Sequence, residues 1–164
     1  GDADGPLLLP VPTFMALAGG PEAAEPALRS LHRDGRIVNH DDLAHVDVTD
    51  QGGHAGVSIF RSTPLPRPIP ILILERHPLG SQAFIPLQDR PWLVLVCTDV
   101  HDFASYRAFT ATGRQGVNYA RNVWHHPLLV LQPDSDFLVV DRGGESENLE
   151  ESWFDESAQI SLEV

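Results

Sequence analysis

The sequence indicates an all-β protein whose short strands form a sandwich or barrel, with only a few short helices. Fourteen prolines and thirteen glycines divide its 164 residues into short segments. Within these segments, apolar residues alternate with polar ones or form short unbroken runs, which is typical of strands. We therefore expect a single domain over residues 1–164, with residues 1–38 and 145–164 at its periphery.

The expected elements follow in order along the chain. Residues 21–31 are predicted to be helical, because a proline suits the first turn and a glycine follows the end. Short apolar or alternating runs predict strands at residues 36–40, 46–49, 55–60, 71–75, 83–86, 92–98, 106–112, 117–119, 128–132 and 137–141. The turn at residues 52–53 is expected to join the second and third of these strands into a hairpin. The prolines of residues 63–70 predict a loop or sheet edge, and residues 99–105 a polar turn or short helix.

The predicted strand at residues 92–98 is expected to be buried on both faces, because its apolar residues do not alternate with polar ones. It contains Cys97, the single cysteine of the chain, which we expect to be a small buried apolar residue. A lone cysteine cannot form an intrachain disulfide, so the sequence suits a reducing compartment such as the cytoplasm.

The net charge of −12 argues against two classes of partner. Nucleic acids and anionic membranes both require a basic surface, which this composition does not favour. No apolar run is long enough to span a bilayer, and the acidic N-terminal residues do not resemble a signal peptide. We expect a small-molecule ligand instead.

Two polar clusters contain the candidate functional residues. The first lies between two predicted strands and consists of Glu75, His77 and Gln82. Glu75 and His77 are two residues apart, so on a strand both side chains would face the same side. The second cluster comprises Asn118, Tyr119, Trp124, His125 and His126. Neighbouring residues face opposite sides of a strand, and we expect His125 rather than His126 to face the site.

A small antiparallel barrel of the cupin type would bring the two clusters together. Cupins bind a metal ion through a His-x-His pair, a carboxylate that follows it, and a later histidine. Glu75, His77, Gln82 and His125 resemble these four positions, although two of the four residue types differ. Oxygen and imidazole ligands would still accept a divalent metal. We expect that no cofactor is required and keep metal binding as an alternative.

The other interpretation is acid–base chemistry without a metal. Imidazole takes and releases protons near neutral pH, and Glu75 could serve as a base or orient an imidazole. Tyr119 could donate a hydrogen bond to a developing oxyanion. Arg61 could pair with a substrate carboxylate through two hydrogen bonds.

Long motifs in the two clusters resemble the ureidoglycolate lyase family, also known as ureidoglycolate hydrolase. These motifs are ERHPLGSQAFIP (residues 75–86), GVNY (116–119), RNVWHHPL (121–128) and FLVVDRG (137–143). The resemblance covers roughly residues 39–144. The family implies a cupin-like antiparallel β-barrel, or jelly roll, that forms a homodimer. It also implies a lyase that splits ureidoglycolate into glyoxylate and urea during allantoin and purine breakdown.

The resemblance suggests a role for each candidate residue. Glu75 and His77 would form the proton-handling pair, and His125 would be a second acid–base group. The residues expected to bind substrate are Arg61, Gln82, Asn118, Trp124 and His126, with Tyr119 donating to the reacting hydroxyl. Two alternatives stay open: a metal-dependent cupin enzyme, such as an isomerase or dioxygenase, and a non-catalytic cupin that binds a small acid.

Overall fold

The computed structural model describes residues 13–17, 21–24, 30–31, 38–39, 42–155 and 160–164. Helical structure in these residues is limited to two short 3-10 turns, η1 (Asp50–Gly52) and η2 (Phe103–Ser105). The strands are β1 (Thr13–Leu17), β2 (Pro21–Ala24), β3 (Ser30–Leu31), β4 (Val38–Asn39), β5 (His54–Ser62), β6 (Ile69–Pro70), β7 (Ile73–Arg76), β8 (Gln82–Pro86), β9 (Trp92–Cys97), β10 (Arg107–Ala111), β11 (Gln115–Tyr119), β12 (Trp124–His125), β13 (Leu129–Val130), β14 (Ser135–Gly143), β15 (Glu150–Trp153) and β16 (Ser161–Leu162).

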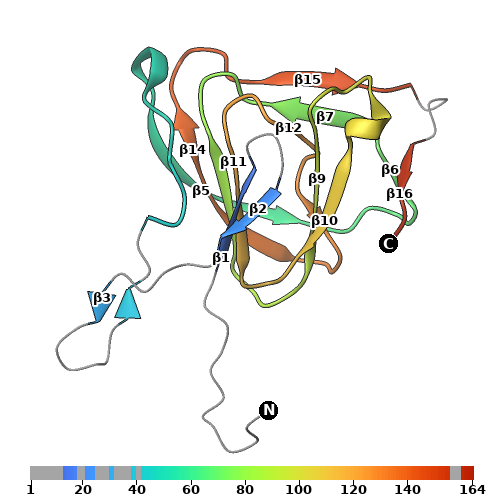
Figure 1. Cartoon of the computed structure of the whole chain (residues 1–164), viewed down its shortest axis with the longest axis horizontal. Coiled ribbons are helices and arrows are strands. Elements are labelled where there is room, and N and C mark those ends of the chain that lie inside the picture. Colours follow the sequence, from blue (N-terminus) through green and yellow to red (C-terminus); the bar gives the residue numbers. More distant parts are fainter. Residues whose placement is uncertain (1–12, 18–20, 25–29, 32–37, 40–41, 156–159) are drawn as a thin grey trace, which may run out of the picture.

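Two larger sheets make up most of the fold. The first sheet has the strand order β2-β1-β11-β8-β14-β5. The second has the order β10-β9-β12-β7-β15, and β13 also pairs with β9. Strand β1 runs parallel to β11, whereas neighbouring strands elsewhere in the two sheets are antiparallel. Figure 1 shows β5, β14 and β11 on one side of the molecule and β9 and β10 on the other. The predicted all-β, cupin-like fold is confirmed.

The main core lies between the inner faces of these sheets. Val117, Phe84 and Val139 are aligned across β11, β8 and β14, so they form one inward-facing row. The ring of Phe137 packs edge-on against Trp92 of the second sheet, with centroids 4.8 Å apart. Each of these side chains is almost fully buried, and burial of one large apolar side chain contributes about 1.5–3 kcal/mol.

A second apolar cluster covers the outer face of β9. Leu93, Leu95 and Cys97 pack there with Ile71 and Leu74, among others. Strand β9 is therefore buried on both faces, as its unbroken apolar run predicted. The buried state of Cys97 is confirmed as well, and burial raises the pKa of its thiol to about 11 with help from the charge of Asp99.

The helix predicted at residues 21–31 is wrong. Residues 21–24 form β2, which pairs with β1, and residues 30–31 form β3, which pairs with β4. Residues 25–29 lie outside the described part of the chain. Pairing with a neighbouring strand has overridden a weak local helix signal.

The hairpin predicted on either side of residues 52–53 is also wrong. Residues 46–49 are not a strand. Their backbone instead contacts the turn before β8, because Asp47 N–H donates to Ser81 Oγ at 2.8 Å and Ser81 N–H donates to the Asp47 carbonyl at 2.8 Å. Strand β5 pairs along its whole length with β14. The alternating pattern of β5 was thus correctly assigned to a strand but to the wrong partner.

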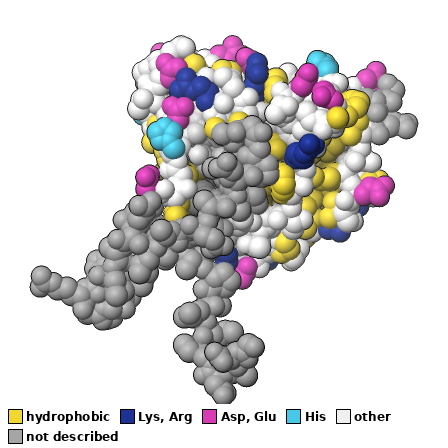
Figure 2. Space-filling view, viewed as in Figure 1, with side chains coloured by type: hydrophobic (Ala, Val, Ile, Leu, Met, Phe, Trp, Pro, Cys, Tyr) yellow, Lys and Arg dark blue, Asp and Glu magenta, His cyan; other side chains and the backbone are white. Residues whose placement is uncertain are grey.

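The remaining predicted strands are present with modest changes at their ends, except that only residues 38–39 of the strand predicted at 36–40 belong to the described part of the chain, where they form β4. The proline-rich stretch of residues 63–70 is mostly loop, and its last two residues form β6, which pairs with β16. The acidic tail contributes β15, an edge strand of the second sheet. None of the described helices is long and apolar enough to cross a membrane. On the face drawn in Figure 2, the described basic side chains are scattered among acidic ones.

Candidate active site

A polar row lies at one end of the core on the inner face of the first sheet. Tyr119, Gln82 and Asp141 are directly aligned on β11, β8 and β14. They stand two residues along their strands from the apolar row of Val117, Phe84 and Val139, and therefore face the same interior. With this strand register, the inner face of the first sheet is apolar along the core and polar at one end.

The second sheet supplies the opposing side chains. Glu75 on β7 is aligned with His125 on β12, and Glu75 Oε1 lies 3.5 Å from His125 Nε2. The ring of Tyr119 stacks on the ring of His125, with centroids 3.9 Å apart and planes 9° apart. His77, one residue beyond β7, brings its ring to 5.4 Å from that of His125. Tyr119 and His125 of the second polar cluster thus lie beside the residues of the first.

His125 presents an unpaired nitrogen to this site. Its side chain is 1% exposed, and Nδ1 lies 2.9 Å from the Val123 carbonyl oxygen. A carbonyl oxygen only accepts hydrogen bonds, so Nδ1 carries the proton and Nε2 is left for other chemistry. Nε2 is buried and has no hydrogen-bond partner among the described residues, because 3.5 Å to Glu75 is too long for a well-formed hydrogen bond. Buried polar atoms are rarely left unpaired, which indicates a ligand at this point.

His77 lies at the end of a chain of hydrogen bonds. The Asp141 carboxylate accepts from Gln82 Nε2 at 3.1 Å, which turns Gln82 Oε1 toward His77 Nε2 at 3.0 Å. The other ring nitrogen, Nδ1, lies 2.8 Å from the Asn148 carbonyl oxygen. Both ring nitrogens of His77 therefore face oxygen acceptors. This arrangement is satisfied when a positive charge, either a second proton or a metal ion, is present at Nε2.

Glu75 is ionised in this environment. Burial raises the pKa of Glu75, but its contact with His125 and the nearby imidazoles of His77 and His126 outweigh burial, so the pKa is lowered overall. Burial, together with the charge of Glu75, raises the pKa of Tyr119 well above its ordinary value. The site therefore combines a carboxylate base with a phenol that remains a hydrogen-bond donor.

A divalent metal ion also fits these residues. Glu75, His77 and His125 offer ligand atoms that all lie within 4.8 Å of one another. Nε2 of His125 has no hydrogen-bond partner among the described residues and is therefore free to bind a metal ion. The amide oxygen of Gln82, beside His77 Nε2, would be a further oxygen ligand. Imidazole nitrogen and carboxylate oxygen together suit transition metals such as zinc, iron or nickel.

Comparisons with known proteins agree with the motifs in this site. The profile of the family described as ureidoglycolate lyase matches residues 22–161. The chain belongs to the ureidoglycolate lyase family. The ureidoglycolate lyase of Burkholderia mallei is 52% identical over 129 residues, which are 77% of this chain and 75% of that protein. That of Brucella melitensis is 50% identical over 135 residues, 82% and 80% of the two chains. Ureidoglycolate lyase 1 of Rhizobium meliloti is 48% identical over 138 residues, 84% and 81%.

Arg61 does not lie beside the other residues of the candidate active site. It forms a two-pronged pair with Asp136, with Nε–Oδ1 at 2.7 Å and Nη2–Oδ2 at 2.9 Å, and its side chain is 65% exposed. Asp136 lies five residues along β14 from Asp141, which corresponds to about 16 Å. The carboxylate-binding role expected for Arg61 from the sequence therefore has no geometric support.

Three other predicted substrate-binding residues lie outside the inner face. Asn118 precedes the inward-facing Tyr119 and donates through Nδ2 to the His45 carbonyl at 3.1 Å. Trp124 packs against the outer apolar cluster, and the guanidinium of Arg76 lies 4.5 Å from its ring centroid. His126 is buried, and its Nδ1 contacts the Pro127 carbonyl at 2.7 Å. Burial lowers the pKa of His126, which favours the neutral ring.

The sequence reasoning missed two residues that contact the site. Asp141 orients Gln82, and Asn148 contacts His77 through its carbonyl oxygen. The alternation of β14 contained a signal for Asp141, because Phe137 and Val139 face the core and Asp141 is next on the same face. Asn148 lies in a loop with no periodicity, so no sequence pattern indicated its contact.

Proposed function

We propose that this protein is a ureidoglycolate lyase, which splits ureidoglycolate into glyoxylate and urea in allantoin breakdown. The observation that supports this most strongly is the unpaired, buried Nε2 of His125, which faces the ionised Glu75 beside His77. A base and an acid close together are what elimination from a carbinolamine requires. Relatives at about 50% identity carry the name ureidoglycolate lyase.

The reaction needs one proton removed and one returned. Glu75, with Nε2 of His125 beside it, accepts the proton of the substrate hydroxyl while the carbon–oxygen double bond forms and the carbon–nitrogen bond breaks. His77, held between two oxygen acceptors, donates a proton to the leaving urea nitrogen. The products are glyoxylate and urea, and no water is consumed. Tyr119 stays protonated, and its hydroxyl would donate a hydrogen bond to the reacting oxygen.

Metal dependence is a separate part of this proposal. A divalent ion would be held by Glu75, His77 and His125, with the amide oxygen of Gln82 adjacent. When bound, it would supply Lewis acidity to the substrate oxygens. The sequence favours a reaction in which no metal is required, since two of the four cupin ligand positions differ.

The test uses metal-stripped protein and racemic ureidoglycolate, with glyoxylate and urea measured together. Equal release of both products that stops at half of the racemate supports a stereospecific lyase without a metal. Release only after addition of a divalent metal keeps the activity and assigns Glu75, His77 and His125 as ligands. If folded protein releases neither product under both conditions, the proposed function is wrong. His77→Ala, expected to lose turnover, serves as the active-site control.

We further propose that the protein is a cytoplasmic homodimer. The reduced, buried Cys97 supports a reducing compartment. Val57 and Ile59 on the edge strand β5 are 69% and 57% exposed, and exposed apolar edges favour association. Light scattering after size-exclusion chromatography is expected to give twice the mass of the chain. A monomer at micromolar concentration would contradict the dimer, and detection only in an extracytoplasmic fraction would contradict the location.

A further inference from the structure

The proposed substrate is an anion, and the candidate active site is itself acidic. The carboxylate of ureidoglycolate is bonded directly to the carbon at which the elimination takes place. The site contains two carboxylate side chains of its own, Glu75 and Asp141, and the whole chain has a net charge of −12. A cation is therefore needed to hold the substrate carboxylate against this repulsion. The chain contains no lysine, so an arginine is the side chain that can supply a permanent positive charge.

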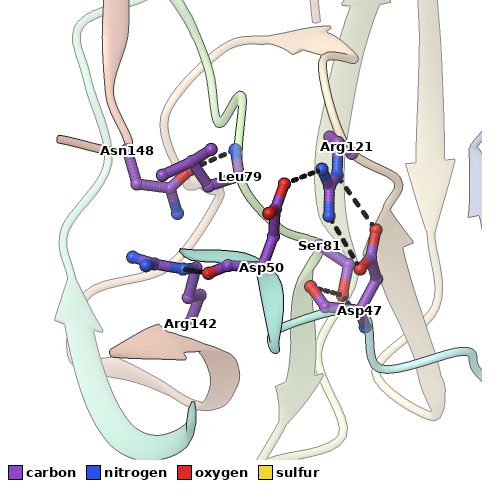
Figure 3. A network of polar contacts seen from close by, with 7 residues as sticks. All are labelled: Asp47, Asp50, Leu79, Ser81, Arg121, Arg142 and Asn148. Atoms are coloured by element: carbon purple, nitrogen blue, oxygen red, sulfur yellow. Dashed lines mark hydrogen bonds and ion pairs between the residues drawn. The ribbon is translucent and has the colours of Figure 1, made fainter. Parts of the chain in front are cut away.

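Four arginines in the described part of the chain are already bound by other groups. Figure 3 shows Arg121 paired with both carboxylate oxygens of Asp47, at 3.1 and 3.0 Å, and with Asp50 at 2.6 Å. In the same network, Arg142 donates to the backbone carbonyl of Asp50 at 3.1 Å. Ion pairs hold the other two, Arg61 with Asp136 and Arg76 with Glu150.

Arg107 is aligned with the candidate active site across the second sheet (Figure 1). The strand register pairs Arg107 of β10 with Val96 of β9. Val96 is in turn aligned with His125 of β12, and His125 with Glu75 of β7. Val96 belongs to the inner core, and Phe109, two residues after Arg107, packs against the same core. Aligned residues take the same face of a sheet, so Arg107 starts from the inner face, in one row with His125 and Glu75.

The guanidinium of Arg107 is available to an anion. Arg107 is exposed, and its Nη1 donates to the backbone carbonyls of Ala104 at 2.7 Å and Tyr106 at 2.8 Å. No carboxylate in the described part of the chain pairs with it, and its Nε and Nη2 have no hydrogen-bond partner there. These two atoms form the edge through which Arg61 holds Asp136. The same edge fits the two oxygens of a substrate carboxylate.

We propose that Arg107 binds the carboxylate of the substrate, a role that rests on the proposed lyase function. Two strand spacings separate Arg107 from His125, which places their backbones about 10 Å apart. An arginine side chain turned along the inner face spans most of this separation, and the substrate carbon beside the carboxylate then lies toward Glu75 and His125. Only a change of side-chain rotamer is required, which is common when a ligand binds.

Steady-state kinetics of Arg107→Gln give the first test. The variant is expected to raise KM for ureidoglycolate about 10- to 100-fold with a smaller change in kcat, because the lost hydrogen bonds are made to a charged group that does not react. Arg107→Lys keeps the charge without the two-pronged edge and is expected to recover part of the loss. Arg61→Gln is the matched control, since it removes an exposed arginine that is paired elsewhere, and should leave both constants unchanged.

Calorimetric titration with glycolate and its neutral amide, glycolamide, tests the charge recognition without turnover. The two ligands share a hydroxyl group next to the carbonyl carbon and differ in charge. The wild type and Arg61→Gln are expected to bind glycolate at least tenfold more tightly than glycolamide, and Arg107→Gln to lose this preference with its glycolamide affinity unchanged. A merely structural role of Arg107 would weaken both ligands alike.

The outcomes separate this inference from the proposed function. A KM of Arg107→Gln within twofold of the wild type, a preference for glycolate that persists in this variant, or a wild type without that preference overturns the inference. Equal weakening of both ligands overturns it as well. If the wild type does not turn over ureidoglycolate, the lyase proposal fails, whereas titration of metal-stripped protein still decides whether Arg107 binds a carboxylate. Arg107→Met replaces Arg107→Gln if that variant does not fold.

Discussion

Glu75 and His125 lie directly opposite each other on neighbouring strands, and Oε1 of Glu75 is 3.5 Å from Nε2 of His125. Only antiparallel pairing of β7 with β12 produces this contact, because the two residues are 50 positions apart in the chain. Around it, Tyr119 stacks on His125 and His77 approaches from the end of β7. This pair lies at the centre of the candidate active site.

Replacement of His125 by glutamine is expected to remove most turnover. The change keeps a polar side chain but deletes the unpaired Nε2, and loss of an acid–base group typically costs about 10²- to 10⁴-fold. The measurement is the steady-state rate of glyoxylate release, with folding checked by circular dichroism. His101→Gln, at an exposed position, is the control and should retain full activity. Turnover of His125→Gln within tenfold of the wild type would exclude His125 from the chemistry.

Tyr119→Phe is expected to lower kcat without unfolding the protein. The variant retains the ring that stacks on His125 but lacks the hydroxyl, whose pKa is raised by burial and which therefore stays a donor. Loss of one donor to a developing oxyanion costs about 100-fold or more. Tyr106→Phe is a matched control, because that hydroxyl donates to the Val100 carbonyl in the outer cluster. Equal kcat values for the two variants would argue against a role for Tyr119 in the reaction.

Arg61→Ala is expected to leave kcat and KM within about twofold of the wild type. Arg61 is mostly exposed and paired with Asp136, far from the Glu75–His125 pair, and exposed ion pairs contribute little to stability. Steady-state kinetics and a thermal melt test both statements. A large rise in KM would restore the substrate-clamp role that the sequence suggested.

Gly53→Ala is expected to destabilise the protein by about 1–3 kcal/mol through overpacking. A Cβ at Gly53 would clash with the Val48 carbonyl oxygen and with Arg142 Nε. Gly56→Ala is the control, because its Cβ would meet the Asp141 carbonyl oxygen at 3.7 Å, an ordinary contact. Urea unfolding measures the difference. Equal loss in both variants would mean that residues 48–53 can shift without cost.

Glu75 is expected to make the stability of metal-stripped protein depend on pH in the acidic range. The folded pKa of Glu75 is below the unfolded value of 4.5, so between these two values the unfolded chain binds more protons and stability rises with pH. The contribution is complete above about pH 5.5 and is lost as pH falls through the folded pKa. As the pH falls below about 4.5, the wild type is expected to lose more stability than Glu75→Gln. A constant difference at every pH would contradict the lowered pKa.

Much of the strand content could be read from local patterns. The two-residue repeat and the unbroken apolar run of β9 are consequences of where side chains point along an extended backbone, which depends on the strand alone. The residues of the two polar clusters could be recognised from their spacing. This spacing places Glu75 and His77 at the end of a strand, and it places the side chains of His125 and Trp124 on opposite faces. The expected activity came from the resemblance of these motifs to those of the ureidoglycolate lyase family.

Pairing and register were decided by contacts distant in sequence. Strand β5 has the same alternation whether its partner is residues 46–49 or β14, and its observed pairing with β14 is a contact between segments far apart in the sequence. The same holds for the site. Which residues meet His77 depends on the loop that carries Asn148 and on the alignment of Gln82 with Asp141. Arg61 lies apart from these residues, because on β5 it is aligned with Asp136, toward the other end of β14. A one-dimensional pattern specifies which face a side chain takes, whereas the partner across that face is set by the three-dimensional packing of the two sheets.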